Sequence, residues 1–210
     1  MDKIDYKKDF KDLYLPKNQA MIIEVPKMKF IVVEGKGNPN ISIEYKNALE
    51  LLYGLSYTLK MSKKGNYQIP HYCEYTVFPL EGLWWTAASQ FDLKAKEKLS
   101  WYAMIRQPDF ITEENYRWAL QQYTKKKGPR DFSSVAFWEF AEGLCVQMLH
   151  LGSYDDEPKS FDTMAKFVTE KGYEKNADNK WHHHEIYLSD PRKVSPENNK
   201  TVLRYSIKKR

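Results

Sequence analysis

The run LCVQMLHLG at residues 144–152 is a short apolar segment that ends at a glycine, which is the pattern of a buried β-strand. A polar loop follows it, and apolar residues then recur at three- and four-residue intervals over residues 161–168, as on one face of a helix. Two further strand-like runs cover residues 182–191 and 201–207. The second half of the chain therefore predicts the order strand, helix, strand, strand.

The first half of the chain predicts the same order. The strand KFIVVEG (29–35) leads into a Gly-Asn-Pro-Asn loop at 37–40, and an apolar stripe then marks a helix over residues 45–59. Strand-like runs at 71–78, with a turn after it at Glu81-Gly82, and at 99–105 complete the order. We therefore expect an α+β fold made of a duplicated strand-helix-strand-strand (SHS2-type) module, with a pocket between two pseudo-twofold-related halves.

The same patterns set the boundaries within one domain, which is what a chain of this length accommodates. We expect one domain over residues 1–210, divided into an N-terminal arm (1–20), a first repeat (21–107), a bridge (108–143) and a second repeat (144–210). The arm is charged and aperiodic, so it predicts a short extension or a loosely packed helix. The bridge predicts a helix capped by Thr112, followed by a hairpin that turns at Glu142-Gly143.

Composition argues against several classes of protein. The chain has 42% hydrophobic and 29% charged residues with a net charge of +5, so neither a membrane span nor a nucleic-acid partner is indicated. Cys73 and Cys145 form no Cys-x-x-Cys pair, and successive residues of the run His182 to His184 alternate faces in a strand, so we expect no metal. A cytoplasmic location fits these features.

Aromatic residues make up 15% of the chain, which is more than a small core usually needs. Such rings either fill the core or line a site in which a flat ligand stacks, and both interpretations stay open. The candidates to bind a planar aromatic small molecule are Trp84, Trp85, Trp101, Trp138 and Phe140.

Glu185 interrupts an otherwise aromatic and apolar strand. Strand alternation places His183 and Tyr187 on the same face as this carboxylate. A carboxylate walled from water has a raised pKa and can move a proton, or it can hold a cationic ligand when ionised. The alternative is an edge-strand glutamate that faces solvent or pairs with a basic side chain. The neighbouring rings favour a pocket that contains Glu185 as the acid or base, with His183 as a ligand-binding residue.

Glu74 holds the matching position in the first predicted repeat, since His-x-Cys-Glu-Tyr at 71–75 parallels His-x-His-Glu-Ile at 182–186. Two facing carboxylates would suit the roles of acid and base, and each would raise the pKa of the other. One copy of a duplicated site often becomes structural, however. We therefore expect Glu185 to be the working acid, with Glu74 as a ligand-binding residue.

Three motifs, LHLGSYDDEP (149–158), HEIYLSDPRK (184–193) and MIRQP (104–108), resemble the GyrI-like small-molecule-binding family. The resemblance extends over most of the chain. It implies the duplicated module, a ligand pocket between the copies and a glutamate at the pocket floor, which falls on Glu185. Many members of the family are fused to a DNA-binding helix-turn-helix region, and this chain resembles a stand-alone member instead.

Stand-alone members similar to this chain are hydrolases of cyclopropanoid, DNA-alkylating compounds, whose strained ring is conjugated to a flat aromatic system. The resemblance thus implies that Glu185 is a general base for water, that Tyr187 hydrogen-bonds the water or the carboxylate, and that no metal or organic cofactor is needed. Two other functions stay open. One is a module that sequesters planar or cationic drugs, and the other is a protein-interaction module, such as a gyrase-directed modulator.

Overall fold

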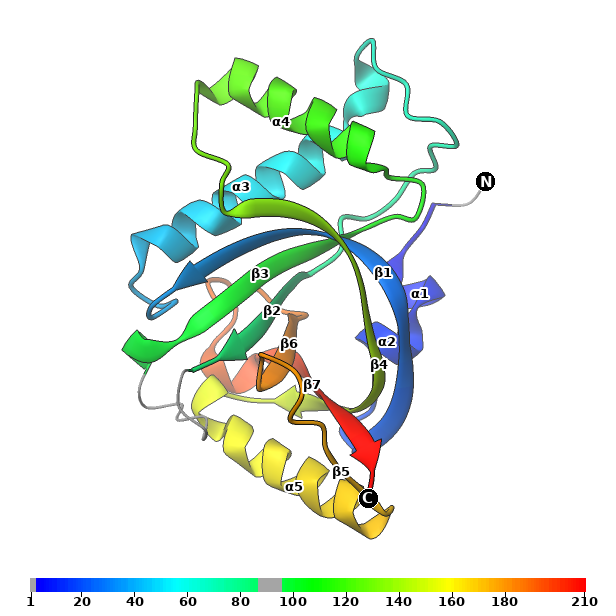
Figure 1. Ribbon diagram of the computed structural model, residues 1–210, viewed down its shortest axis with the longest axis vertical. Helices are drawn as coiled ribbons and strands as arrows, with labels where there is room; N and C mark the ends of the chain where they lie inside the picture. The colour runs from blue at the N-terminus through cyan, green and yellow to red at the C-terminus, as the bar shows by residue number, and fades with distance from the viewer. Residues whose placement is uncertain (1–2, 87–95) are drawn as a thin grey trace.

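The computed structural model describes residues 3–86 and 96–210 (Figure 1). Within these residues, six antiparallel strands form a closed ring in the order β4-β1-β3-β2-β6-β7, with β7 pairing back to β4. A seventh, short strand, β5, pairs with the far end of β7. The strands are β1 (Met21–Lys36), β2 (Leu80–Trp85), β3 (Ser100–Gln107), β4 (Val135–Leu151), β5 (Tyr173–Lys175), β6 (His183–Tyr187) and β7 (Lys200–Lys209). The sheet is therefore barrel-like, with helices outside it.

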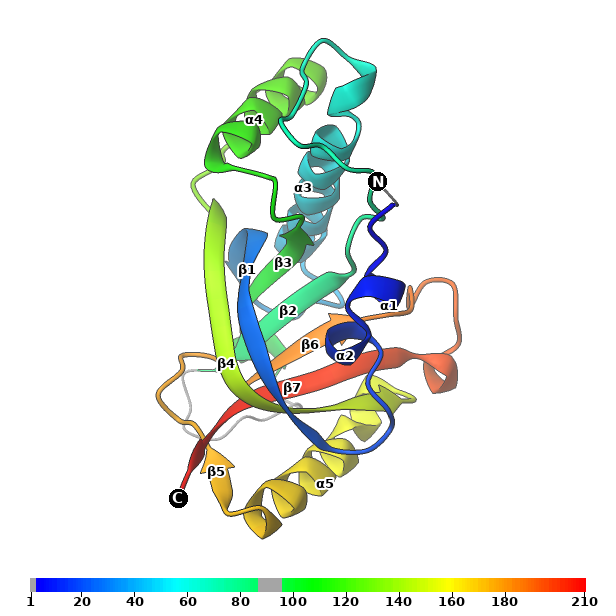
Figure 2. The same ribbon diagram turned by 90° about the vertical axis from the view of Figure 1, so that its right-hand side faces the viewer.

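Helices cover the barrel at two opposite ends (Figures 1 and 2). Helix α3 (Ile43–Lys60) packs on β1 and β3 and is itself covered by α4 (Glu113–Lys127), while α5 (Glu157–Glu170) packs on β4 and β5. The remaining described helical segments are α1 (Tyr6–Asp9), α2 (Lys11–Tyr14) and the 3-10 turns η1 (Ser62–Lys64), η2 (Lys96–Lys98), η3 (Tyr154–Asp156) and η4 (Pro196–Asn198). The fold is thus a mixed α/β fold.

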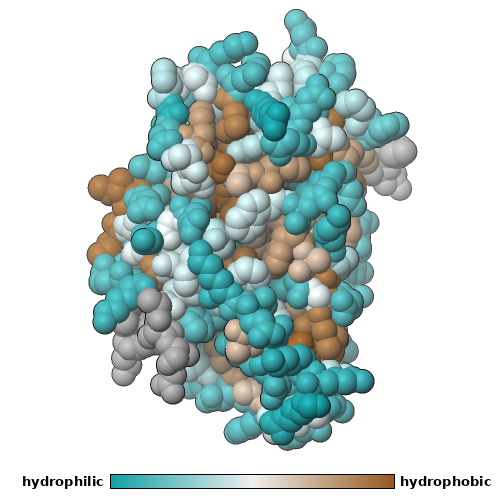
Figure 3. Space-filling model, viewed as in Figure 1, coloured by the Kyte–Doolittle hydropathy of each residue, from teal (hydrophilic) through white to brown (hydrophobic). Residues whose placement is uncertain are grey.

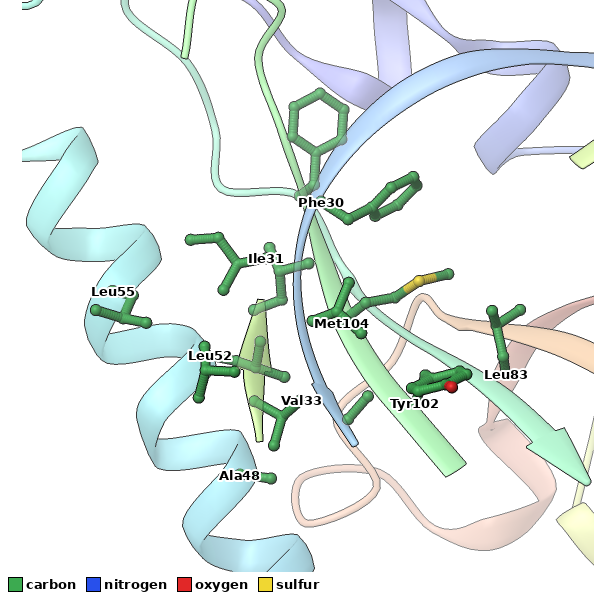
Figure 4. Close-up of a cluster of buried hydrophobic side chains, with 14 of the residues drawn as sticks. Phe30, Ile31, Val33, Ala48, Leu52, Leu55, Leu83, Tyr102 and Met104 are labelled. Atoms are coloured by element: carbon green, nitrogen blue, oxygen red, sulfur yellow. The ribbon is translucent and has the colours of Figure 1, made fainter. Parts of the chain in front are cut away.

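The apolar stripe predicted for the first helix packs on the barrel. Figure 4 shows Leu52 and Leu55 of α3 directed at Ile31 and Val33 of β1. All four side chains are buried, and each one contributes about 1.5–3 kcal/mol to folding by leaving water. Ser42 caps this helix by accepting a hydrogen bond from a backbone N–H of the first turn. Local sequence and tertiary packing therefore specify the same helix.

The helix predicted to begin after Thr112 is also confirmed. Thr112 caps α4 and forms a reciprocal capping box with Asn115. The helix ends at Gly128, which has a φ of 86° and so adopts a backbone conformation that suits glycine.

The strand predicted at residues 71–78 is wrong. This segment is irregular apart from an isolated bridge between Ile4 and Tyr75, so no neighbouring strand is present to continue a ladder. The strand begins instead at Leu80 and runs through Glu81-Gly82, where a turn was predicted. The segment lacks the regular alternation of a strand, and its buried rings pack against other aromatic side chains.

The hairpin predicted around Glu142-Gly143 is wrong as well. Strand β4 is continuous through Gly143, and its pairing with β1 keeps one register from Met21 opposite Gln147 to Val33 opposite Val135. Gly143 has a φ of 72°, a conformation that most side chains disfavour. Gly143, where a turn was predicted, is therefore the place where one long strand bends. The curvature of β1 and β4 is visible in Figure 1.

The order strand, helix, strand, strand occurs in both halves, as β1-α3-β2-β3 and as β4-α5-β6-β7, with β5 between α5 and β6. Because residues 71–78 contain no strand, the residue-by-residue match of Glu74 with Glu185 is wrong. That the halves are copies of one module stays a prediction.

The N-terminal arm is packed more tightly than predicted. Leu13 and Tyr14 of α2 are buried, and the ring of Phe10 lies 4.1 Å from the guanidinium carbon of Arg106 on β3. Helix α2 therefore belongs to the core of the domain.

Candidate functional site

Glu185 lies in the middle of β6, in a part of the sheet where two strands supply side chains to one face. Gly82 and Trp84 of β2 pair with Glu185 and His183 of β6, so these four residues share that face. Aromatic residues from α3 and α5 reach the same face, because Tyr45 packs on Trp84 and Phe161 packs on His183. The carboxylate is consequently only 8% exposed.

Three side chains form a chain of hydrogen bonds to this carboxylate. The Tyr187 hydroxyl donates to Oε2 of Glu185 at 2.7 Å, and it accepts a hydrogen bond from Nε1 of Trp84 at 3.1 Å. Nε2 of His183 lies 2.7 Å from Oε1 of the same glutamate. A carboxylate offers about four acceptor positions, so these contacts leave acceptor positions unused. The charge on Tyr187 is disfavoured, since burial and the Glu185 carboxylate raise its pKa well above the ordinary value.

The position of Trp84 depends on the absence of a side chain at residue 82. A Cβ atom at Gly82 would lie 2.6 Å from Nε1 of Trp84, which is closer than real Cβ contacts. The indole therefore lies over the backbone of Gly82. It is directly beside Glu185, which pairs with Gly82 from the neighbouring strand β6. Glycine is required here because of this close approach.

Tyr45 and Trp101 extend the aromatic wall. The ring of Tyr45 lies 5.9 Å from Trp84 and 4.9 Å, edge-on, from the fully buried Trp101. Burial and the nearby charge of Glu185 raise the pKa of the Tyr45 hydroxyl. Trp101 thus forms a second layer behind Tyr45. The sequence predicted Tyr45 only as part of the apolar stripe of the first helix.

The start of α5 closes the other side of the site. Tyr154 in η3 lies edge-on to Tyr187 at 6.1 Å, and Phe161 lies edge-on to His183 at 5.0 Å. Glu157 stands between them in the sequence and is 1% exposed. This acid could not be recognised in the sequence, because an acidic residue in the first turn of a helix usually interacts with the helix dipole and solvent.

Three of the predicted ligand-binding rings lie elsewhere. Trp85 packs at 4.7 Å on Tyr102, which packs at 4.7 Å on Trp138, and the ammonium of Lys180 lies 4.3 Å from the Trp85 ring. Phe140 contacts other rings: Phe30 and Trp181. These contacts are with rings other than Tyr45, Trp84 and Tyr187.

Glu74 does not share a site with Glu185 as far as the described contacts go. Its carboxylate pairs with Lys63, and its side chain is 39% exposed. Its backbone carbonyl accepts a hydrogen bond from Ile4. The predicted pair of facing carboxylates is therefore not formed by these two glutamates.

A second polar cluster occupies the other face of β6, inside the barrel. The ring nitrogens of His184 lie 2.9 Å from both Glu81 and Glu142, and Arg204 contacts Glu142 at 3.4 Å. Tyr14 of the arm donates to Glu81 at 3.0 Å. Burial alone would lower the pKa of His184, but the two carboxylates outweigh it and raise this pKa. We call these five residues the barrel network; through Tyr14, and through a hydrogen bond from Arg204 to the backbone carbonyl of Leu13, it holds the arm against the barrel.

Two features are absent from residues 3–86 and 96–210. No group of three His, Cys, Asp or Glu side chains in these ranges is arranged to hold a metal ion. None of the helices there has the length and apolarity to cross a membrane.

A barrel-like sheet with a buried carboxylate walled by aromatic rings defines a class of protein that encloses small ligands. The chain matches the GyrI-like small molecule binding domain over residues 19–208, and it belongs to that family. The resemblance expected from the sequence motifs is thereby confirmed. No curated protein matches the chain.

Three solved structures from Listeria innocua are similar over nearly the whole chain. An uncharacterized conserved protein is 44% identical, with a TM-score of 0.92, and the match covers 98% of this chain and 100% of that one. A hydrolase encoded by lin2189 is 42% identical, with a TM-score of 0.92 and coverage of 99% and 100%. Another hydrolase is 41% identical, with a TM-score of 0.90 and coverage of 98% and 100%. The C-terminal domain of EcmrR, at 11% identity and a TM-score of 0.53 over 91% and 98% of the two chains, shares the fold alone.

Proposed function

We propose that this protein hydrolyses a strained, electrophilic ring in a planar small molecule, and that Glu185 is the general base. The observation that carries the proposal is the buried carboxylate of Glu185, which Tyr187 and His183 orient beside the indole of Trp84. Two similar proteins from Listeria innocua are described as hydrolases, which supports a hydrolytic reaction. A cyclopropanoid whose three-membered ring is conjugated to a flat aromatic system fits both features.

The reaction needs one water molecule and no external oxidant or reductant. Glu185 takes a proton from the water as its oxygen attacks a carbon of the three-membered ring. A carbon–carbon bond of that ring breaks, and its electron pair moves into the conjugated system, which then takes up a proton. The single product carries the new hydroxyl group on the attacked carbon and a neutral, more aromatic ring system. Such opening of a DNA-alkylating ring removes the electrophile and would detoxify the compound.

The aromatic residues supply binding and orientation. Trp84, Tyr45 and Tyr187 lie around the carboxylate, so a planar ligand that enters the site and stacks on these rings would hold its strained ring near Glu185. Holding the ring and the base in this geometry reduces the entropic cost of reaction.

The test is incubation of the protein with a cyclopropanoid, with water addition followed by mass spectrometry. Glu185→Gln should keep ligand affinity but lose about 10²–10⁴-fold in rate, as is usual when a general base is removed. Glu74→Gln is the matched control, since it makes the same change outside the site, and its rate should equal that of the wild type. Absence of turnover by the wild-type protein rules out the hydrolase.

The burial of Glu185 among rings also favours a second function, which is binding of planar cations without chemistry. In that case Glu185 supplies the counter-charge, so Glu185→Gln loses affinity for a cationic dye and no ligand is converted. The affinity and the rate of this one variant therefore separate the two functions. A protein-interaction role would need a continuous exposed apolar patch, and on the face shown in Figure 3 the apolar side chains are interrupted by hydrophilic residues.

A further inference from the structure

Glu157 is the first residue of α5 and is 1% exposed. Among the residues that the structure describes, its Oε1 atom has no hydrogen-bond partner. An unsatisfied buried polar atom costs about 1–3 kcal/mol, so a buried carboxyl oxygen without a partner needs an explanation, such as a catalytic role or a bound water. The stability of the fold alone does not explain a carboxyl at this position.

The residues on both sides of Glu157 contact the hydrogen-bond partners of Glu185. Tyr154 packs on Tyr187, and Phe161, one helical turn after Glu157, packs on His183. The start of α5 therefore lies against the site, and Glu157 is close enough to Glu185 for the charge of Glu185 to act on it. This placement brings a second carboxyl to the site from an element that the sequence did not connect with it.

The two carboxyls lie in different surroundings. Glu185 has partners at both oxygens, including the donating hydroxyl of Tyr187, which suits an ionised carboxylate. The orphaned oxygen of Glu157 suits a neutral carboxyl. Burial, followed by the negative charge of Glu185, raises the pKa of Glu157 well above its ordinary value, and Lys96 offsets only part of this. A pair of carboxyls whose environments favour opposite protonation states is the usual arrangement of an acid and a base.

The position of Glu157 in its helix also has a matched comparison in this chain. Glu113 is the first residue of α4, but its side chain is 51% exposed and pairs with Arg117 at 3.1 Å. Glu113 therefore shows the ordinary behaviour of an acid at a helix N-terminus. Glu157 differs because the fold encloses it beside Glu185.

We propose that Glu157 is the catalytic acid of the ring-opening reaction, a role that rests on the hydrolytic function proposed above. As the ring carbon–carbon bond breaks, its electron pair reaches the far end of the conjugated system, and the carboxyl proton of Glu157 transfers to the atom that receives this pair. At the same time Glu185 accepts the proton of the attacking water. The step ends with Glu185 protonated and Glu157 ionised, and transfer of one proton between them, directly or through water, restores the starting state.

The role predicts a bell-shaped dependence of kcat on pH, in which the acidic limb reports the base and the basic limb reports the acid. The titratable and charged groups that face the pair are His183 and Tyr187 on β6, Tyr45 on α3, Tyr154 and Asp155 in η3, and Lys96 in η2. Because several of these groups are titratable too, the basic limb can be assigned to Glu157 only with a variant that removes this carboxyl alone.

The experiment compares the wild-type protein with Glu157→Gln and Glu113→Gln, using cyclopropanoid turnover and ligand affinity from pH 5 to 10. We expect Glu157→Gln to bind the compound as the wild type does, to lose about 10²–10⁴-fold in kcat, and to lose the basic limb. Glu113→Gln makes the same change of charge at the same helix position and should match the wild type.

The possible outcomes separate the two proposals. If the wild type turns over the compound and Glu157→Gln reacts at the rate of Glu113→Gln, the catalytic acid is overturned and the hydrolase stands. If the wild type has no turnover, both are overturned. Should Glu157→Gln fail to fold, Glu157→Asp retains a carboxyl that is one methylene shorter. Its kcat should fall while the basic limb remains, and an unchanged kcat overturns the role.

Discussion

The indole of Trp84 lies over the backbone of Gly82, so closely that a Cβ atom at residue 82 would come within 2.6 Å of Nε1. The same Nε1 donates to Tyr187, which donates to Glu185. The missing side chain at Gly82 is thus connected to the carboxylate through two hydrogen bonds. A change at this glycine therefore tests the geometry of the whole site.

We expect Gly82→Ala to displace Trp84 and to break its hydrogen bond to Tyr187. Alanine normally stabilises a strand relative to glycine, but the overlap with the indole should outweigh this gain and cost about 1–3 kcal/mol. Urea unfolding measures the stability, and tryptophan fluorescence reports the displacement. Gly65→Ala is the control, because its Cβ would meet the nearest atom at 3.6 Å. Equal stability and spectra of the two variants would contradict the close approach.

Tyr187→Phe removes a hydroxyl that both donates and accepts a hydrogen bond. It leaves Nε1 of Trp84 without this acceptor and Glu185 without this donor, so we expect a loss of about 1–3 kcal/mol in the free energy of unfolding. Turnover should fall as well, since the carboxylate loses one of the groups that orient it. Tyr57→Phe, at a residue that is 51% exposed, should leave both measurements unchanged. A Tyr187→Phe protein as stable as the Tyr57→Phe protein would show that the hydroxyl contributes little.

The barrel network should make stability depend on pH on both sides of an optimum. Burial alone would raise the pKa of Glu142, but His184 and Arg204 outweigh it and hold this pKa below the ordinary value of 4.5. Its contribution is therefore present above pH 4.5 and is lost as the pH falls through the lowered pKa. The pKa of His184 is raised, so its contribution is complete below pH 6.5 and is lost as the pH rises through the raised pKa.

Thermal unfolding between pH 3 and pH 9 measures this dependence. The unfolding temperature should be highest between pH 4.5 and 6.5, where both contributions are present. Glu142→Gln removes one partner of a buried pair, so it should cost about 3–5 kcal/mol and flatten the acidic side of the profile. Glu139→Gln, on the same strand but with a side chain that is 48% exposed, is the control. An acidic side that Glu142→Gln leaves unchanged would mean that other groups cause it.

Much of the helical structure was predictable because it depends on local signals. The stripe of α3 and the Thr112 cap of α4 each need only residues within a few turns. The closed sheet was not predictable, since closure depends on pairing between β4 and β7 and on a β4 that bends at Gly143 instead of turning back. A glycine between two apolar runs has the same sequence pattern whether the chain turns back in a hairpin or only bends within one strand.

The candidate site was predictable where strand alternation applies. Alternation placed His183 and Tyr187 beside Glu185, and the structure shows both within 2.7 Å of its oxygens. It could not identify Glu157 or Tyr45, because they come from helices that meet β6 only in the folded chain. The match of Glu74 with Glu185 failed because a short sequence similarity suggested a strand at residues 71–78, and this segment has only an isolated bridge and no partner strand.

The protonation of Glu157 has a consequence for stability that does not depend on any substrate. Burial and the charge of Glu185 raise its pKa above the ordinary value of 4.5, so its favourable contribution is complete below that pH and is lost as the pH rises through the raised pKa. Glu157→Gln carries no charge at any pH. The wild type should therefore lose unfolding free energy relative to Glu157→Gln as the pH rises from 5 to 9, measured by urea unfolding. Because His184 is present in both proteins, its own titration cancels in the difference, and a difference that stays constant with pH would mean that Glu157 is already ionised in the folded protein.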